Sequence, residues 1–508
     1  MRMPPIFDKG RRRGLILIAG LALLQGIAAG GAAFATRILF GGLHQGAPIS
    51  IAALAMVAAA GLIIAGARIS FAVTGDRLGQ AYALDIRKAL FNHATGLAAS
   101  DVEARRVGYI SLRFVGDMTA FKAWFSLGLP HLVAGLVQLP ILMLVMGLLD
   151  PVFGVMGFVI NAIALALILW LGRDMAEVHK SLRSRRASIA ADMADLMPAA
   201  HDLGQLGRTK IDIRHLRKLT RRMVDASVHR ARRAETLVAI ADIATASMAA
   251  LILWRAYADG METGVIAGAL AALGLGGVSL RSIASALDQR GAFLAAEEKC
   301  AAALARPRQR MRSGARTLAK GPLSLTVDKD AFDRAPAISF SVGAGERLVL
   351  SHAAAEGAEK LFSTLQGRER RPDGEIRIGG VPLEEIAPSS LRRRVGRVTT
   401  SPLILRGSLR RTLALGRRKR PSDKRILAMM EMVGLDELLL DLNLSLLAGG
   451  PELTHGERAR LSLANALLNK PGVLLVDAAA TAQLFDLEKV LKRCGFAETT
   501  LITVRPDS

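Results

Sequence analysis

Long apolar runs, separated by short or strongly basic segments, dominate residues 1–304. Six of these runs have about the length, roughly 17 to 25 residues, that an α-helix needs to cross a bilayer. They lie near residues 14–36, 47–67, 123–149, 151–172, 236–254 and 263–287. The pattern predicts an α-helical membrane domain of six spans.

Two charged residues interrupt these runs. Asp242 lies in the fifth run and Arg281 in the sixth, at similar depth. Ionisable residues inside a membrane are candidates for function by default. We favour a structural ion pair where the two helices approach the cytosol. Contact with a transported substrate stays open as the alternative.

A second domain follows the spans. Residues 305–322 are basic, contain prolines and glycines and lack periodicity, which predicts a linker. From residue 323 to residue 508, short apolar runs alternate with helical patterns. The runs "RLVL" at 347–350, "VLLV" at 473–476 and "TTLITV" at 499–504 predict strands, and "EKLFSTL" at 359–365 predicts the start of a helix. Uninterrupted apolar strands are typical of parallel sheets, so we expect an α/β domain.

Lysine and arginine are distributed unevenly around the predicted spans. The N-terminal segment and the long connections at 68–122 and 173–235 hold 28 of them, whereas the short connections hold only Arg37 and Arg255. Because positive residues collect on the cytosolic side, both termini and both long connections are expected there. The first run follows three arginines, as in a signal peptide, but its apolar core is too long for one.

Composition narrows the class of protein. The 508 residues are 51% hydrophobic and carry a formal net charge of +23. A nucleic-acid surface combines basic groups with stacking aromatic rings. Only 4% of the residues are aromatic, so we expect no nucleic-acid partner and attribute the charge to topology and anionic lipid headgroups. Cys300 and Cys494 lie far apart and lack metal-ligand spacing.

Four stretches of the second domain resemble, in order, the nucleotide-binding domain of ABC transporters. They are "GERLVL" at 345–350, "LFSTLQG" at 361–367, the segment 391–416 and the segment 453–477. With the preceding spans, they make nearly the whole chain similar to an exporter-type half-transporter. The resemblance implies a transmembrane domain at 1–304, a linker at 305–322 and an ABC nucleotide-binding domain at 323–508. By that comparison the domain is degenerate and C-terminally short.

The expected phosphate loop departs from the working pattern. In G-x-x-x-x-G-K-[ST], backbone amides and a lysine hold phosphates, and a hydroxyl binds Mg²⁺. When the family pattern is laid on the chain from Gly345 without gaps, His352 and Ala355 replace two glycines and Gly357 keeps a third. Part of the phosphate cradle is therefore missing.

The charged positions of this loop have changed as well. Ala358 stands at the lysine position and Glu359 at the hydroxyl position, with Lys360 beside it but about 200° around a helix axis from Ala358. A lost charged hydrogen bond removes roughly 1.5–3 kcal/mol. A like charge near 4 Å adds about 4 kcal/mol of repulsion at an effective dielectric constant of 20. Together these remove roughly four decades of affinity, so we expect the chain alone to be inactive as an ATPase.

Other positions that the resemblance makes catalytic carry unsuitable side chains. Thr400 replaces the Q-loop glutamine, Ala478 replaces the general base, and Arg505 replaces the switch histidine. Asp477 alone is retained, as a candidate magnesium ligand or as a merely structural aspartate at a strand end. We predict no catalytic residue in this chain.

One segment stays nearer to its working form. Thr454, His455, Gly456 and Glu457 resemble the signature motif, which presents a helix N-terminus to ATP held by the other subunit. Equally, Thr454 and Glu457 have the spacing of a capping box that merely begins a packed helix. Both interpretations stay open.

The resemblance implies one subunit of an exporter. We expect the catalytically impaired half of a heterodimer, with ATP and Mg²⁺ held, if at all, at a site shared with an intact ABC half-transporter. A non-transporting membrane regulator or scaffold that keeps the ABC fold is the alternative. The expected location is a bacterial inner membrane, where lipid is a further partner. The spans, rich in Ala, Leu and Gly, identify no transported substrate.

The charge distribution makes a prediction about orientation. In a chain whose two cysteines, Cys300 and Cys494, have been replaced by serine, a membrane-impermeant maleimide added to intact cells should label Gln45→Cys but not Gln205→Cys. Labelling after the cells are opened is the control for reactivity. The reverse pattern would refute the orientation.

Overall fold

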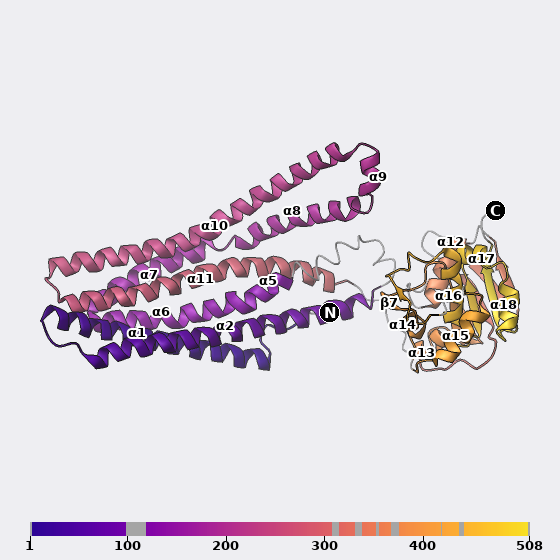
Figure 1. Ribbon diagram of the computed structural model, residues 1–508, viewed down its shortest axis with the longest axis horizontal. Coiled ribbons are helices and arrows are strands. Elements are labelled where there is room, and N and C mark those ends of the chain that lie inside the picture. Colours follow the sequence, from indigo (N-terminus) through magenta and orange to yellow (C-terminus); the bar gives the residue numbers. More distant parts are fainter. Residues whose placement is uncertain are drawn as a thin grey trace. The chain divides into compact units, whose positions relative to one another are not determined.

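The computed structural model describes residues 3–97, 118–306, 314–330, 338–351, 355–366, 375–417, 419–435 and 441–505. These residues form two compact units (Figure 1). The described part of unit 1 covers residues 3–95 and 118–306 and is helical. Unit 2 lies within residues 314–505, apart from residues 96–97, and is α/β. The predicted fold classes of both halves are confirmed.

Some helices of unit 1 are far longer than a bilayer requires. The helices that the structure describes in this unit are α1 (Lys9–His44), α2 (Ile51–Ala94), α5 (Met118–Ala123), the π-helical η2 (Trp124–Gly128), α6 (Leu129–Leu149), α7 (Pro151–Leu171), α8 (Met175–Leu196), α9 (Ala200–Gln205), α10 (Thr209–Ala258) and α11 (Thr263–Leu304). Within the described residues, six helical stretches are long and apolar enough to cross a membrane, as predicted.

The longest helices extend well past the apolar runs. At 1.5 Å per residue, the 50 residues of α10 span about 75 Å, against a hydrocarbon core of about 30 Å. Figure 1 shows α8 and the first part of α10 leaving the helical bundle together, joined by α9. The second long connection is therefore a helical hairpin.

The two charges inside the spans lie on neighbouring helices and meet. The guanidinium of Arg281 on α11 forms an ion pair with the carboxylate of Asp242 on α10. Both side chains are about half exposed. The expected pairing is confirmed, whereas a role in contacting substrate remains untested.

Two glycines allow α2 to approach α5 and η2 closely. A Cβ atom at Gly75 would lie 2.5 Å from the carbonyl oxygen of Ser126, and one at Gly79 would lie 2.7 Å from that of Lys122. Glycines spaced four apart permit such close backbone contact between membrane helices. One turn further along α2, the ring of Tyr82 stacks on Phe125 at 4.0 Å between ring centroids. The glycine pair therefore positions an aromatic cluster.

The described residues of unit 2 form two four-stranded sheets and a short ribbon. The antiparallel sheet has the order β2 (Ile338–Val342), β1 (Leu325–Asp330), β4 (Glu375–Ile378) and β5 (Val381–Pro382). The parallel sheet has the order β3 (Arg347–Leu350), β10 (Thr500–Val504), β9 (Val473–Val476) and β6 (Val395–Val398). Strands β7 (Gly407–Ser408) and β8 (Ser445–Leu446) form the ribbon. The predicted strands therefore exist, and three of them are parallel neighbours.

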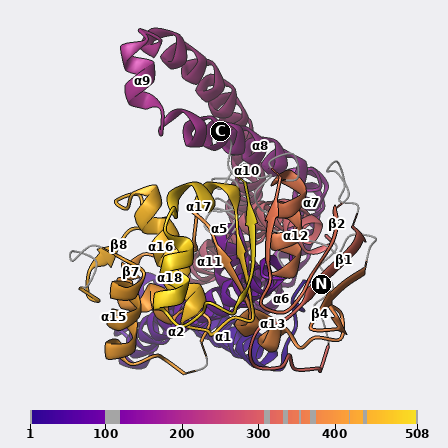
Figure 2. The same ribbon diagram turned by 90° about the vertical axis from the view of Figure 1, so that its right-hand side faces the viewer.

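Helices cover both faces of the parallel sheet. They are α12 (Ala355–Leu365), α13 (Pro388–Arg394), α14 (Leu409–Ala414), α15 (Asp423–Met432), α16 (His455–Leu467), α17 (Ala478–Gln483) and α18 (Leu487–Arg493). Alternate residues of β9 enter different cores, because successive side chains of a strand point to opposite faces. Figure 2 shows α15, α16 and α18 on one side of the sheet and α12 on the other. Leu474 packs in the core on the first side, and Leu475 packs in the core on the α12 side. Helix α12 begins at Ala355, not at Glu359 as predicted.

The close approach of α2 to η2 makes a stability prediction. Gly75→Val should lower the unfolding midpoint of unit 1, because the new side chain meets backbone atoms, and overpacking costs about 1–3 kcal/mol. Thermal unfolding in detergent can be followed by the fluorescence of tryptophan, which includes Trp124 of η2. Gly66→Val is the matched control, since nothing lies within 4 Å of a Cβ there. Equal midpoints for the two variants would contradict the prediction.

Candidate functional site

The candidate site lies where the parallel strands end. In open α/β sheets, ligands bind outside the carboxyl ends of the strands. Strands β6 and β9 run in register, with Val398 opposite Val476, so their ends lie side by side. Asp477 follows β9 directly, and β3 precedes α12 in the chain. The predicted phosphate-loop and magnesium residues therefore come from elements that meet at one edge.

Helix α12 offers no cation at the expected lysine position. The side chain of Ala358 is fully buried and packs in the core beneath the sheet, and Gly357 is buried beside it. Lys360 forms an ion pair of 3.2 Å with Glu356, one turn earlier on the same helix. The lysine position thus holds only a methyl group that faces the core.

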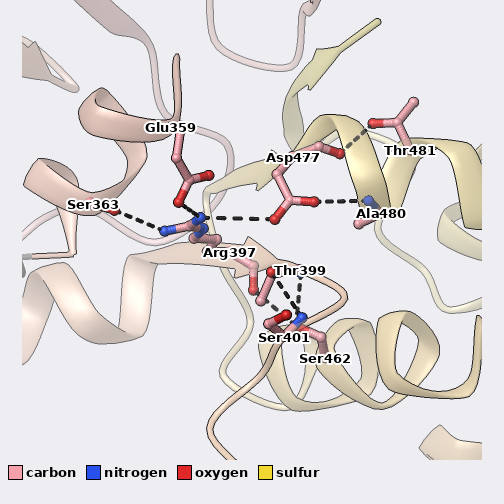
Figure 3. A network of polar contacts seen from close by, with 9 residues as sticks. All are labelled: Glu359, Ser363, Arg397, Thr399, Ser401, Ser462, Asp477, Ala480 and Thr481. Atoms are coloured by element: carbon pink, nitrogen blue, oxygen red, sulfur yellow. Dashed lines mark hydrogen bonds and ion pairs between the residues drawn. The ribbon is translucent and has the colours of Figure 1, made fainter. Parts of the chain in front are cut away.

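An arginine from a different strand faces Glu359. The side chain of Arg397, on β6, is 5% exposed, and its guanidinium pairs with the carboxylate of Glu359 (Figure 3). Its Nη1 donates to Ser363 Oγ at 3.1 Å. Its Nη2 lies 3.8 Å from Asp477 Oδ2. The two carboxylates at this edge therefore face one cation of the chain itself.

This pairing corrects part of the sequence argument. From the sequence, Glu359 was expected to repel ATP as an isolated charge. Because Arg397 compensates that charge, repulsion by Glu359 is weaker than the expected value of about 4 kcal/mol. Arg397 was not among the residues expected at this site. The sequence did contain a signal for Arg397. It is the charged residue in "VGRV", an otherwise apolar run that is able to form a buried strand.

Asp477 has a structural role in this arrangement. Its Oδ1 accepts a hydrogen bond of 2.8 Å from the amide of Ala480 and so caps the N-terminus of α17. Burial raises the pKa of Asp477 above its ordinary value, and the Ala480 amide and the charge of Arg397 oppose part of that rise. Nowhere among the described residues do three His, Cys, Asp or Glu side chains gather as metal ligands would. The structural interpretation of Asp477 accounts for one of its oxygens.

The remaining expected catalytic positions hold neutral or unsuitable groups. Thr400 is buried after β6, and Ala478 is the first residue of α17. Arg505 follows β10, where its backbone amide donates to Leu350. His352 lies outside the described residues. None of the three described side chains can act as a general base at neutral pH.

The signature-like segment forms an accessible helix N-terminus. Thr454 is the N-cap of α16, and its Oγ1 accepts from the amide of Glu457 at 3.2 Å. The carboxylate of Glu457 accepts in turn from the Thr454 amide at 2.7 Å, which confirms the capping box. A Cβ at Gly456 would meet only Gln483 Oε1, at 3.7 Å, and His455 is exposed. Within the described chain, then, nothing requires glycine at position 456.

Comparison with known proteins assigns both halves. Residues 15–259 match the family described as "ABC transporter transmembrane region", and residues 336–481 match "ABC transporter". An uncharacterised ABC transporter ATP-binding protein of Bacillus subtilis, YknV, is 20% identical over 82% of this chain and 71% of its own length.

Two further relatives match over shorter stretches. A multidrug resistance ABC transporter ATP-binding and permease protein of Lactococcus lactis is 24% identical over 31% of this chain. The mycobactin import ATP-binding/permease protein IrtB of Mycolicibacterium thermoresistibile is 30% identical over 28% of it. The matches span only 27% and 26% of those two proteins.

The capping box makes a prediction about local stability. Thr454→Ala should speed amide hydrogen exchange in the first turn of α16 by about fivefold, because losing such a cap costs about 1 kcal/mol. Exchange is measured by mass spectrometry on the full chain in detergent. Ser422→Ala is the control, since Ser422 is the N-cap of α15 without a capping hydrogen bond from its side chain. Unchanged exchange at α16 would show that the hydrogen bonds contribute nothing.

Proposed function

Because the chain belongs to the ABC transporters, with an N-terminal transmembrane region fused to an ABC ATPase domain, we propose that it is the catalytically impaired half of a heterodimeric exporter. The chain is a multi-pass integral membrane protein and an exporter-type subunit. ABC domains in general bind ATP with Mg²⁺. The proposal concerns which ATP site this subunit serves.

One contrast within unit 2 supports the proposal. The lysine position on α12 is a buried alanine, whereas the N-terminus of α16 is accessible and keeps glycine at position 456. A helix N-terminus binds phosphate through its free amides. The part that would serve a partner's nucleotide is thus kept, while the part that would hold this chain's own nucleotide is changed.

The space around Gly456 gives the strongest support for this proposal. A Cβ there would make only an ordinary contact within this chain, so its own packing does not explain the glycine. A γ-phosphate approaching the helix backbone would explain it, because any side chain would hold the triphosphate away. The proposed partner is therefore a second ABC half-transporter whose phosphate loop is intact. ATP and Mg²⁺ would bind at the site the two subunits share.

A membrane regulator or scaffold is the second candidate. The capping box accounts for Thr454 and Glu457 without any nucleotide, and this observation favours a purely structural α16. Under that hypothesis the ABC fold is kept as an interaction surface. Both candidates place the chain in a bacterial inner membrane with its termini in the cytosol, and neither specifies a substrate.

Substitution of Gly456 distinguishes the two candidates. Gly456→Asp should abolish the ATPase activity of the co-expressed pair, because it places a carboxylate against a triphosphate. Asn469→Asp, which adds the same charge just past the other end of α16, should leave that activity nearly unchanged. Ala358→Lys combined with Glu359→Ser should also change it little. The purified chain alone should show neither ATP binding nor hydrolysis.

Assembly is verified by co-purification of both subunits. A Gly456→Asp pair that assembles and hydrolyses ATP at the original rate would refute the heterodimer proposal and favour the regulator. Micromolar binding of a fluorescent ATP analogue by the purified chain would refute the proposed impairment.

A further inference from the structure

We infer that the guanidinium of Arg397 takes the place of a divalent cation at the nucleotide edge of unit 2, bridging Glu359 and Asp477. These are the two positions that the family resemblance assigns to magnesium. The inference deepens the proposed impairment and rests on the proposed function only in treating this edge as a nucleotide site. It gives the impairment a physical cause, and its test needs no partner subunit.

Because the carboxylate of Asp477 is mostly buried, it needs a positive charge nearby, and the guanidinium of Arg397 supplies one. The side chain of Asp477 is 14% exposed and that of Arg397 is 5% exposed. A buried charge without a compensating charge or hydrogen bonds is strongly unfavourable. Arg397 comes from β6, Glu359 from α12 and Asp477 from the end of β9, so one cation connects three elements of the edge (Figure 3). Ser363 holds the same guanidinium from α12.

Magnesium does not fit this arrangement. It requires oxygen ligands at about 2.0–2.1 Å in near-octahedral geometry. The carboxylate of Glu359 is engaged by Arg397. Asp477 Oδ1 accepts from the Ala480 amide, Oδ2 lies on the guanidinium side, and the Thr399 side chain also hydrogen-bonds this carboxylate. A divalent ion would lie beside a buried positive charge. Ala358 stands buried at the lysine position, and Lys360 of the same helix is paired with Glu356.

The carboxylates of Glu359 and Asp477 therefore have a compensating positive charge without Mg²⁺ or nucleotide. An ordinary cation site gains stability when its metal binds, because the metal offsets repulsion between the ligands. In this chain Arg397 of β6 supplies that positive charge permanently. Unit 2 should then show no stabilisation by Mg²⁺, and removing Arg397 should create such a response.

The experiment measures amide hydrogen exchange of α12 and α17 in the full chain in detergent, with EDTA or with millimolar MgCl₂. The wild-type chain should exchange identically in both. Arg397→Gln should exchange at least about tenfold faster in EDTA, because it leaves the mostly buried carboxylate of Asp477 without its neighbouring positive charge. Mg²⁺ should slow that exchange again. Arg377→Gln is the control, because Arg377 pairs with the exposed Glu375 on β4. It should leave the exchange of both helices unchanged.

Two outcomes would overturn the inference. One is a wild-type chain that Mg²⁺ already protects, and the other is an Arg397→Gln chain that Mg²⁺ does not protect. If Arg397→Gln does not fold, the double variant Arg397→Gln with Glu359→Gln decides. If uncompensated charge caused the folding defect of Arg397→Gln, the double variant should fold, and Mg²⁺ should not change its hydrogen exchange. Failure of the double variant to fold would assign Arg397 a packing role and refute the inference. All these outcomes are independent of the ATPase activity of the heterodimer.

Discussion

The arrangement of unit 2 depends on the convergence of parallel strands at one edge of a sheet. Strands β6 and β9 end side by side, so the side chains at their ends must be compatible with one another in charge. Here they carry a guanidinium and a carboxylate, both mostly removed from water. Because buried charges need partners, the strand order makes Arg397 and Asp477 dependent on each other, and Arg397 also pairs with Glu359 of α12. The chemistry of the edge follows from that topology.

Unit 1 follows a different constraint. Inside lipid, a backbone must satisfy its own hydrogen bonds, so the apolar runs become helices and the irregular connections lie outside. Apolar side chains gain little by leaving lipid, so close packing has to hold the helices together. Gly75 and Gly79 provide the same kind of close packing beyond the apolar run 47–67, where the extension of α2 meets α5 and η2.

Short-range patterns in the sequence predicted many elements of this structure. Apolar runs gave the six spans and strands β3, β9 and β10, and the spacing of Thr454 and Glu457 gave the capping box. The start of α12 was placed too late, because Ala355, a good helix former, stands where the family has a loop glycine. Arg397 was missed because its partners lie 38 and 80 positions away along the chain. Only the strand order brings them together, and no local pattern encodes it.

The ion pair between Asp242 and Arg281 bears on how unit 1 responds to voltage. A membrane potential acts on net charge, at about 2.3 kcal/mol per elementary charge for each 100 mV. Joined across α10 and α11, these residues present a dipole with no net charge. When both helices move together, the pair transfers no charge through the field. A rearrangement that shifts the pair as a unit without turning it is thus electrically silent at this position, whereas one that moves either charge alone along the membrane normal is not.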